Sequence, residues 1–210
     1  MAKKSDLIFP IIAMAITVAA SNILVAYPVR LFALEHVLTY SALVFPLVFL
    51  TNDFTNRLYG PAAARQVVYV GFIIAFIISL FLASARISIA ASIAFLLGQL
   101  LDIAIFTPLR SKTWWIAPLC ASVFGCILDS ALFFSLAFAP QFSFLDTAFG
   151  FHDSSLGQYV GFYNFMIPLW LSIAIGSLGV KLIMSVAMVL PYGAILLFLK
   201  QGFCVKQRAY

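Results

Sequence analysis

Long runs of apolar residues, separated by short stretches with charged residues, Gly or Pro, make up almost the whole chain. A helix needs about 20 apolar residues to cross the hydrocarbon core of a bilayer, and six runs come close to this length or exceed it. They cover residues 7–27, 40–58, 64–84, 87–109, 115–139 and 165–190. The pattern predicts an all-α, polytopic membrane protein whose six transmembrane helices form a single integral membrane domain over residues 1–210.

Two segments fit this pattern less simply. Residues 140–163 are predicted to be a long, aromatic, Gly-containing connection before the last span. The apolar run after it continues to Leu199, and roughly 50 Å of helix is more than a bilayer needs. We expect Pro191 to kink this helix or to mark where it leaves the membrane. Whether a separate re-entrant segment follows Pro191 stays open.

The composition excludes a soluble protein. Hydrophobic residues make up 64% of the chain and charged residues 9%, against about 45–50% and about 25% in soluble domains. No G-x-x-x-x-G-K-[ST] run is present, so the chain is not expected to hydrolyse ATP through a P-loop. The spans contain no His, no HExxH and no GxSxG, which argues against an enzyme. The three Cys residues have no metal or disulfide spacing, and we expect neither metal nor cofactor.

The basic residues indicate the orientation. They are scattered between apolar segments and form no phosphate-binding stripe, so no nucleic-acid partner is predicted despite the net charge of +5. With the N-terminus inside, the cytoplasmic side receives Lys3, Lys4, Arg57, Arg65, Arg110, Lys112, Lys200, Lys206 and Arg208. The opposite side receives Arg30 and Arg86. The positive-inside rule therefore predicts that both termini are cytoplasmic.

Three charged residues fall at membrane depth: Asp102 in the fourth span, Asp129 in the fifth and Lys181 in the sixth. Each costs about 2.5–3.5 kcal/mol to insert. Leu would insert better, so these side chains must contribute something else. They either bind a solute or pair with one another to hold helices together. For Asp53, one turn before Arg57, a self-stabilising i,i+4 pair is an equally good explanation.

Polar and aromatic residues share helix faces in the last three spans. Helical spacing puts Ser88, Ser92, Phe95, Gln99, Asp102 and Phe106 on one face of the fourth span. Similar stripes are Ser122, Gly125, Cys126 and Asp129 in the fifth span, and Ser177, Lys181 and Ser185 in the sixth. We expect these faces to turn inward and to line a common polar cavity.

The same residues carry a resemblance to a known family. The stretches concerned are residues 21–25 (SNILV), 45–53 (FPLVFLTND), 57–60 (RLYG), 64–65 (AR), 86–87 (RI), 98–102 (GQLLD), 114–118 (WWIAP), 124–125 (FG), 129–130 (DS) and 190–191 (LP), with Lys181. In this order they resemble the bacterial queuosine precursor transporters, also called the vitamin uptake transporter family. Asn52 departs from the pattern, since the family more often has Thr before the Asp.

The resemblance implies a multi-pass protein of the bacterial inner membrane. It would import the 7-deazaguanine bases preQ0 and preQ1, precursors of the modified tRNA nucleoside queuosine. The partners implied are this small-molecule base and the lipid bilayer, while the oligomeric state, including a homo-oligomer, stays open. The alternative is a substrate-binding subunit of an energy-coupling-factor vitamin transporter, which would need a separate ATPase module.

The candidate substrate-binding residues are Asn22, Asp53, Phe95, Gln99, Asp102, Phe106, Asp129 and Lys181. We expect Asp102 and Asp129 to accept hydrogen bonds from a guanine-like edge or to couple protons. Phe95 and Phe106 would stack on a planar base. Gln99 and Asn22 would orient the base, and Lys181 would neutralise an acid when the site is empty. Energy coupling, by proton symport or by facilitated entry, stays open.

Overall fold

The computed structural model describes residues 7–24, 27, 40–150, 152–153, 155–162 and 165–207, with the backbone alone at 42, 162, 165 and 199–207. The helices are α1 (Ile8–Leu24), α2 (Tyr40–Val44), α3 (Pro46–Tyr59), α4 (Pro61–Leu82), α5 (Ala85–Leu109), α6 (Ile116–Phe138), α7 (Phe144–Ala148) and α8 (Leu169–Gln207). A 3-10 turn, η2 (Pro140–Phe142), and two strands, β1 (Tyr159–Phe162) and β2 (Phe165–Pro168), lie between α6 and α8. The prediction of an all-α protein is confirmed only in part, because the described residues are mostly helical but include the β1–β2 pair.

Within the described residues, four helices are long and apolar enough to cross a membrane: α4, α5, α6 and the part of α8 from Leu169 to Phe198. They correspond to four of the six predicted spans. Helix α1 is apolar but shorter, with 17 residues. Six spans and cytoplasmic termini stay predictions, and Lys3, Lys4, Arg30 and Arg208 lie outside the described residues.

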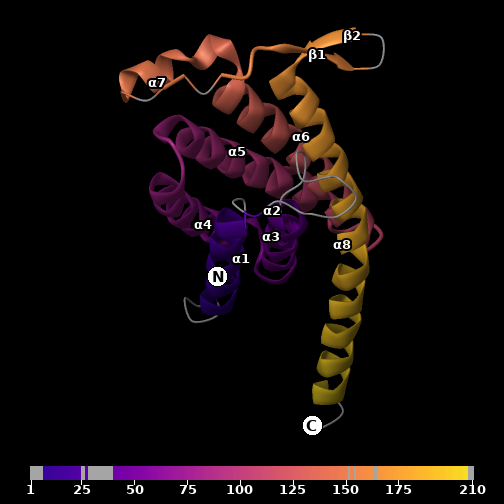
Figure 1. The fold of residues 1–210 in the computed structure, drawn as a ribbon. Coiled ribbons are helices and arrows are strands. Elements are labelled where there is room, and N and C mark those ends of the chain that lie inside the picture. Colours follow the sequence, from indigo (N-terminus) through magenta and orange to yellow (C-terminus); the bar gives the residue numbers. More distant parts are fainter. Residues whose placement is uncertain are drawn as a thin grey trace.

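The second predicted span is not one helix. Helix α2 ends at Val44, and α3 begins at Pro46 and has 14 residues. Pro46 lacks a backbone N–H and so cannot continue the hydrogen bonds of a preceding helix. Phe45 between the two helices keeps a helical backbone, with φ −53° and ψ −38°, and Figure 1 shows α2 and α3 beside α1 near the middle of the molecule.

The connection predicted before the last helix contains regular structure, which the sequence did not indicate. After η2 and α7, strands β1 and β2 pair antiparallel with Tyr159 opposite Pro168. The prediction that the last helix begins near residue 165 was wrong. Pro168 disfavours the helical conformation of Ile167 before it, so the helix begins at Leu169.

Helix α8 runs from the hairpin to the C-terminal end without interruption, although Pro191 lies inside it. Between Pro191 and Gln207 the described residues form no separate re-entrant segment. Figure 1 shows this helix passing along the other helices and beyond them. Large apolar side chains such as Ile183 and Leu190 are exposed on it, as expected for a surface that faces hydrocarbon rather than water.

Two glycines bring α5 and α6 close together. A Cβ on Gly98 would lie 3.1 Å from the Cβ of Asp129, and a Cβ on Gly125 would lie 2.6 Å from a ring carbon of Phe49. Small residues of this kind permit close helix packing in membranes. Helix α5 also packs on α3 and α4, and α8 packs on α3 and α6. The inner faces of α3, α5, α6 and α8 therefore meet.

Candidate functional site

The predicted polar face of α5 turns inward, and this prediction is confirmed. The six side chains that share it are all buried: Ser88, Ser92, Phe95, Gln99, Asp102 and Phe106. The stripe on α6, with Ser122, Gly125, Cys126 and Asp129, is buried as well. On α8, Lys181 and Ser185 are buried and Ser177 is half-buried.

An acid pair lies between α3 and α5. Asp53 is 1% exposed and Asp102 is 0% exposed, and their carboxyl groups interact directly. The amide Nδ2 of Asn52 donates to Oδ2 of Asp102 over 2.9 Å and to the backbone oxygen of Gln99 over 3.3 Å. Two carboxylates in contact repel each other, so the pair favours a proton or a hydrogen-bond-donating ligand beside it.

Several polar atoms around this pair have no hydrogen-bond partner in the described part of the chain. They are Oδ1 of Asp53, Oδ1 of Asp102, Oδ1 of Asn52 and both amide atoms of Gln99. Each unsatisfied buried group costs about 1–3 kcal/mol. Such groups are rare in folded proteins and require an explanation. A ligand that supplies the missing donors and acceptors would provide one.

A second polar cluster joins α6 and α8. Nζ of Lys181 lies 2.7 Å from Oδ2 of Asp129 and 3.2 Å from Oγ of Ser130. It also lies 4.9 Å from the ring centroid of Phe45, within cation–π distance. This ion pair is what the predicted neutralising role of Lys181 requires. A purely structural brace requires it equally.

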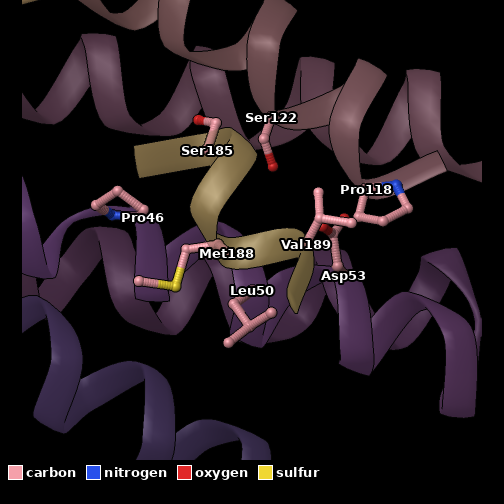
Figure 2. A pocket seen from close by; sticks show the side chains of 8 residues that line it. All are labelled: Pro46, Leu50, Asp53, Pro118, Ser122, Ser185, Met188 and Val189. Atoms are coloured by element: carbon pink, nitrogen blue, oxygen red, sulfur yellow. The ribbon is translucent and has the colours of Figure 1, made fainter. Parts of the chain in front are cut away.

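A small hollow lies between α3, α6 and α8, and Figure 2 shows its lining. The side chains are Pro46, Leu50 and Asp53 of α3, Pro118 and Ser122 of α6, and Ser185, Met188 and Val189 of α8. Asp53 belongs to the acid pair. Ser185 donates to the backbone oxygen of Lys181 and contacts Cys126. The hollow therefore separates the two polar clusters, and it has room for roughly one water molecule.

Arg57 does not form the i,i+4 ion pair with Asp53 that the sequence left open, since no such pair within 4.0 Å is found between these two described residues. Its guanidinium carbon instead lies 5.4 Å from the ring centroid of Phe106 and 5.6 Å from that of Tyr192. Nε and Nη2 of Arg57 are buried without a hydrogen-bond partner.

Two candidate residues lie apart from the acid pair. Phe95 is part of an apolar core cluster formed by α1, α3, α4 and α5. Asn22 is half-buried on α1, and its amide donates to the backbone oxygen of Val18 over 3.0 Å. The polar residues that sequence reasoning did not select are Asn52, Asn56, Arg57 and Tyr192. The unusually polar run from 51 to 57 within an apolar chain was the available signal for the first three.

The similarity of this chain to known proteins agrees with a polar site enclosed by apolar helices. The family model described as "Putative vitamin uptake transporter" matches residues 39–86 and 79–195. The chain belongs to this family. The matched part includes the acid pair, the Lys181–Asp129 pair and Tyr192, but not Asn22. A transporter family and several membrane-length apolar helices make the chain a multi-pass membrane protein.

Two relatives of this chain are described by function. The chain is 30% identical to the "Queuosine precursor transporter" of Escherichia coli K12 over 205 residues, which covers 86% of this chain and 82% of the relative. It is 32% identical to the "Probable queuosine precursor transporter" of Haemophilus influenzae over 156 residues, which covers 64% of this chain and 63% of that relative. No solved structure matches the chain.

Proposed function

We propose that this chain imports queuosine precursors, specifically the 7-deazaguanine bases preQ0 and preQ1, across the bacterial inner membrane. The names of both relatives support the substrate class. From the structure, the supporting observation is the buried pair of Asp53 and Asp102, with unsatisfied acceptor atoms beside the free amide of Gln99.

The chemistry of this pair suits a guanine-like edge. That edge offers two adjacent N–H donors, which a carboxylate accepts in bidentate fashion, next to a carbonyl acceptor. One carboxyl group of the pair, Asp102 or Asp53, takes the two donors. The amide nitrogen of Gln99 donates to the carbonyl. The atoms that lack partners in the structure are then satisfied by the base.

Of the two rings predicted to stack on the base, Phe95 and Phe106, we expect only Phe106 to contact it. Phe106 is buried one turn after Asp102 on the same face of α5 and packs with Tyr192 in a small cluster. Phe95 is enclosed by apolar side chains of the core. A planar base bound at Asp102 is therefore expected to stack on Phe106.

Lys181 and Asp129 form the second part of the proposed mechanism. In the absence of base, Lys181 neutralises Asp129 across 2.7 Å. A protonated aminomethyl substituent carries the same charge as the lysine ammonium, and it replaces Lys181 at Asp129 during passage. The neutral cyano substituent of preQ0 has no such requirement.

The hollow between the clusters is far smaller than a two-ring base. Met188 and Val189 of α8 line it together with Leu50 of α3. Transport therefore requires α3 and α8 to separate, so that the base reaches the acids from one side and leaves on the other. The structure corresponds to a closed arrangement of this route.

The test is growth of a bacterial strain blocked in precursor synthesis. With this gene present, nanomolar external preQ0 or preQ1 should restore queuosine in tRNA, and without the gene it should not. Equal queuosine levels in both strains would contradict the proposal. Uptake by the purified chain alone in proteoliposomes separates it from the alternative, a subunit that depends on an ATPase module. Uptake only after addition of that module would favour the alternative.

A further inference from the structure

A cationic side chain contacts two aromatic rings one helical turn from Asp53. The guanidinium carbon of Arg57 of α3 lies over the rings of Phe106 of α5 and Tyr192 of α8, 5.4 Å and 5.6 Å from the two ring centroids. Tyr192 in turn packs against Phe54, with centroids 4.7 Å apart. Three helices thus hold one planar cation in place.

Two of the three nitrogens of this guanidinium are not used as donors within the described part of the chain. Nε and Nη2 of Arg57 are buried and have no hydrogen-bond partner in the described residues, and the same holds for Oη of Tyr192. Asp53 is one helical turn away and interacts with Arg57 electrostatically, but no ion pair joins them. Arg57 as a whole is half-buried, but buried N–H groups without a partner are costly, and the rings restrict the freedom of the guanidinium to find another partner.

The acid pair and Arg57 together require a particular order of hydrogen-bond donors and acceptors in a ligand. The pair of Asp53 and Asp102 supplies acceptors, whereas Arg57 supplies donors in a fixed planar fork. A ligand edge that fits both must place N–H donors beside an acceptor oxygen. A lactam next to an amino group has this order. If an amino group replaces the carbonyl, its N–H donors face the N–H donors of Arg57, and no hydrogen bond can form between them.

We propose that Arg57 is a specificity-determining residue, which donates to the carbonyl oxygen of the base beside Gln99 and rejects bases with an amino group at that position. This inference rests on the proposed function, because it names what the same site selects. Phe106 and Tyr192 act as positioning residues that keep the guanidinium flat and in reach. The selection depends on unpaired polar groups in a buried site, where a mismatched partner is heavily penalised.

The experiment is equilibrium binding to the purified full-length protein in detergent, with 7-deazaguanine and 7-deazaadenine as competitors of labelled preQ1. The wild type should prefer 7-deazaguanine by at least about 100-fold. In Arg57→Gln this ratio should fall by at least about tenfold, and Arg57→Lys, which keeps the charge but loses the fork, should lie between them. Arg65→Gln, at an exposed Arg of α4, should keep the wild-type ratio.

The ratio of the affinities for 7-deazaguanine and 7-deazaadenine shows whether Arg57 selects the base or only supports the structure. A variant that only loosens the site weakens both competitors alike and leaves the ratio unchanged, and that result in both Arg57 variants would overturn the inference. Should Arg57→Gln fail to give a monodisperse protein, Arg57→Lys decides by the same ratio. Absence of preQ1 binding in the wild type would instead contradict the proposed function.

Discussion

Asn52 of α3 donates a hydrogen bond from its amide to Oδ2 of Asp102 on α5 over 2.9 Å, and both side chains are fully buried. The bond fixes one oxygen of the carboxyl group and leaves Oδ1 without a partner in the described part of the chain. An acceptor held in this way is preorganised for a ligand, because little side-chain freedom is lost on binding.

Asp102→Asn should therefore reduce uptake of labelled preQ1 to background at an unchanged amount of protein in the membrane. The amide has almost the same size, but its NH₂ group replaces an acceptor and meets the donor of Asn52 or of the base. Uptake in membrane vesicles, normalised by immunoblot, measures the effect. Asp153→Asn, at a side chain that is 62% exposed, is the matched control. Wild-type uptake by Asp102→Asn would remove this carboxylate from the proposed site.

Substitutions at Lys181 and Asp129 can show whether this ion pair binds the substrate or only stabilises the fold. Lys181→Met leaves Asp129 with an uncompensated charge in a buried position, at a cost of about 3–5 kcal/mol. Thermal unfolding in detergent should show this loss. The double variant Lys181→Met with Asp129→Asn removes both charges and should recover most of the stability.

Uptake by the same double variant decides between the two roles. We expect preQ1 uptake to stay near background although the fold is restored, because the acid that takes the aminomethyl group is gone. Uptake of the neutral preQ0 should be less affected. Recovery of both stability and preQ1 uptake would mean that the pair only holds α6 and α8 together.

Gly125→Ala should destabilise the packing of α6 on α3. Its Cβ would lie 2.6 Å from a ring carbon of Phe49, which is 1% exposed and has little space to move. Overpacking of this kind costs about 1–3 kcal/mol. Gly179→Ala on α8 meets nothing within 4 Å and should keep the wild-type melting temperature or raise it slightly. Equal melting temperatures for the two variants would contradict the close approach at Gly125.

Arg86, which charge counting assigned to an outer loop, is fully buried at the start of α5. It donates to the backbone oxygens of Leu136 over 2.9 Å and of Ala139 over 2.6 Å, and to Asp146 over 2.8 Å. These bonds attach the segment after α6 to α5. Arg86→Met should therefore increase the rate of limited proteolysis within residues 139–158 several-fold, because the unpaired partners favour local opening.

Substitution of the two acids near Arg86 should change the rate of proteolysis to different extents. Asp146→Asn removes a buried ion pair and should accelerate proteolysis, whereas Asp153→Asn should change it little, since Asp153 is exposed and lies 3.5 Å from Arg86. The pKa of Asp153 is below its ordinary value, mainly because Ser155 hydrogen-bonds it. Its small contribution is present above the unfolded-state pKa and is lost as the pH falls through the lowered pKa. Similar effects of both substitutions would contradict this ranking.

The inward face of α5 could be predicted from the sequence, whereas the surroundings of each side chain on it could not. Phe95 and Phe106 both lie on that face at helical spacing. One is enclosed by the apolar core and the other packs beside Arg57 and Tyr192. Which neighbouring helix covers each turn of α5 depends on packing, and no local pattern contains that information.

The sequence by itself determined that the chain lies in a membrane, and that polar faces of three helices turn inward. Hydropathy and helical periodicity are local properties, so a single segment is enough to reveal them. Only the tertiary structure decided which charges meet: Asp53 with Asp102, Asp129 with Lys181, and Arg86 with Asp146. The partners come from different helices, and Asn52 and Asp102 are 50 residues apart. Such contacts follow from how helices pack at residues such as Gly98, because close approach at one point fixes the neighbours of all others.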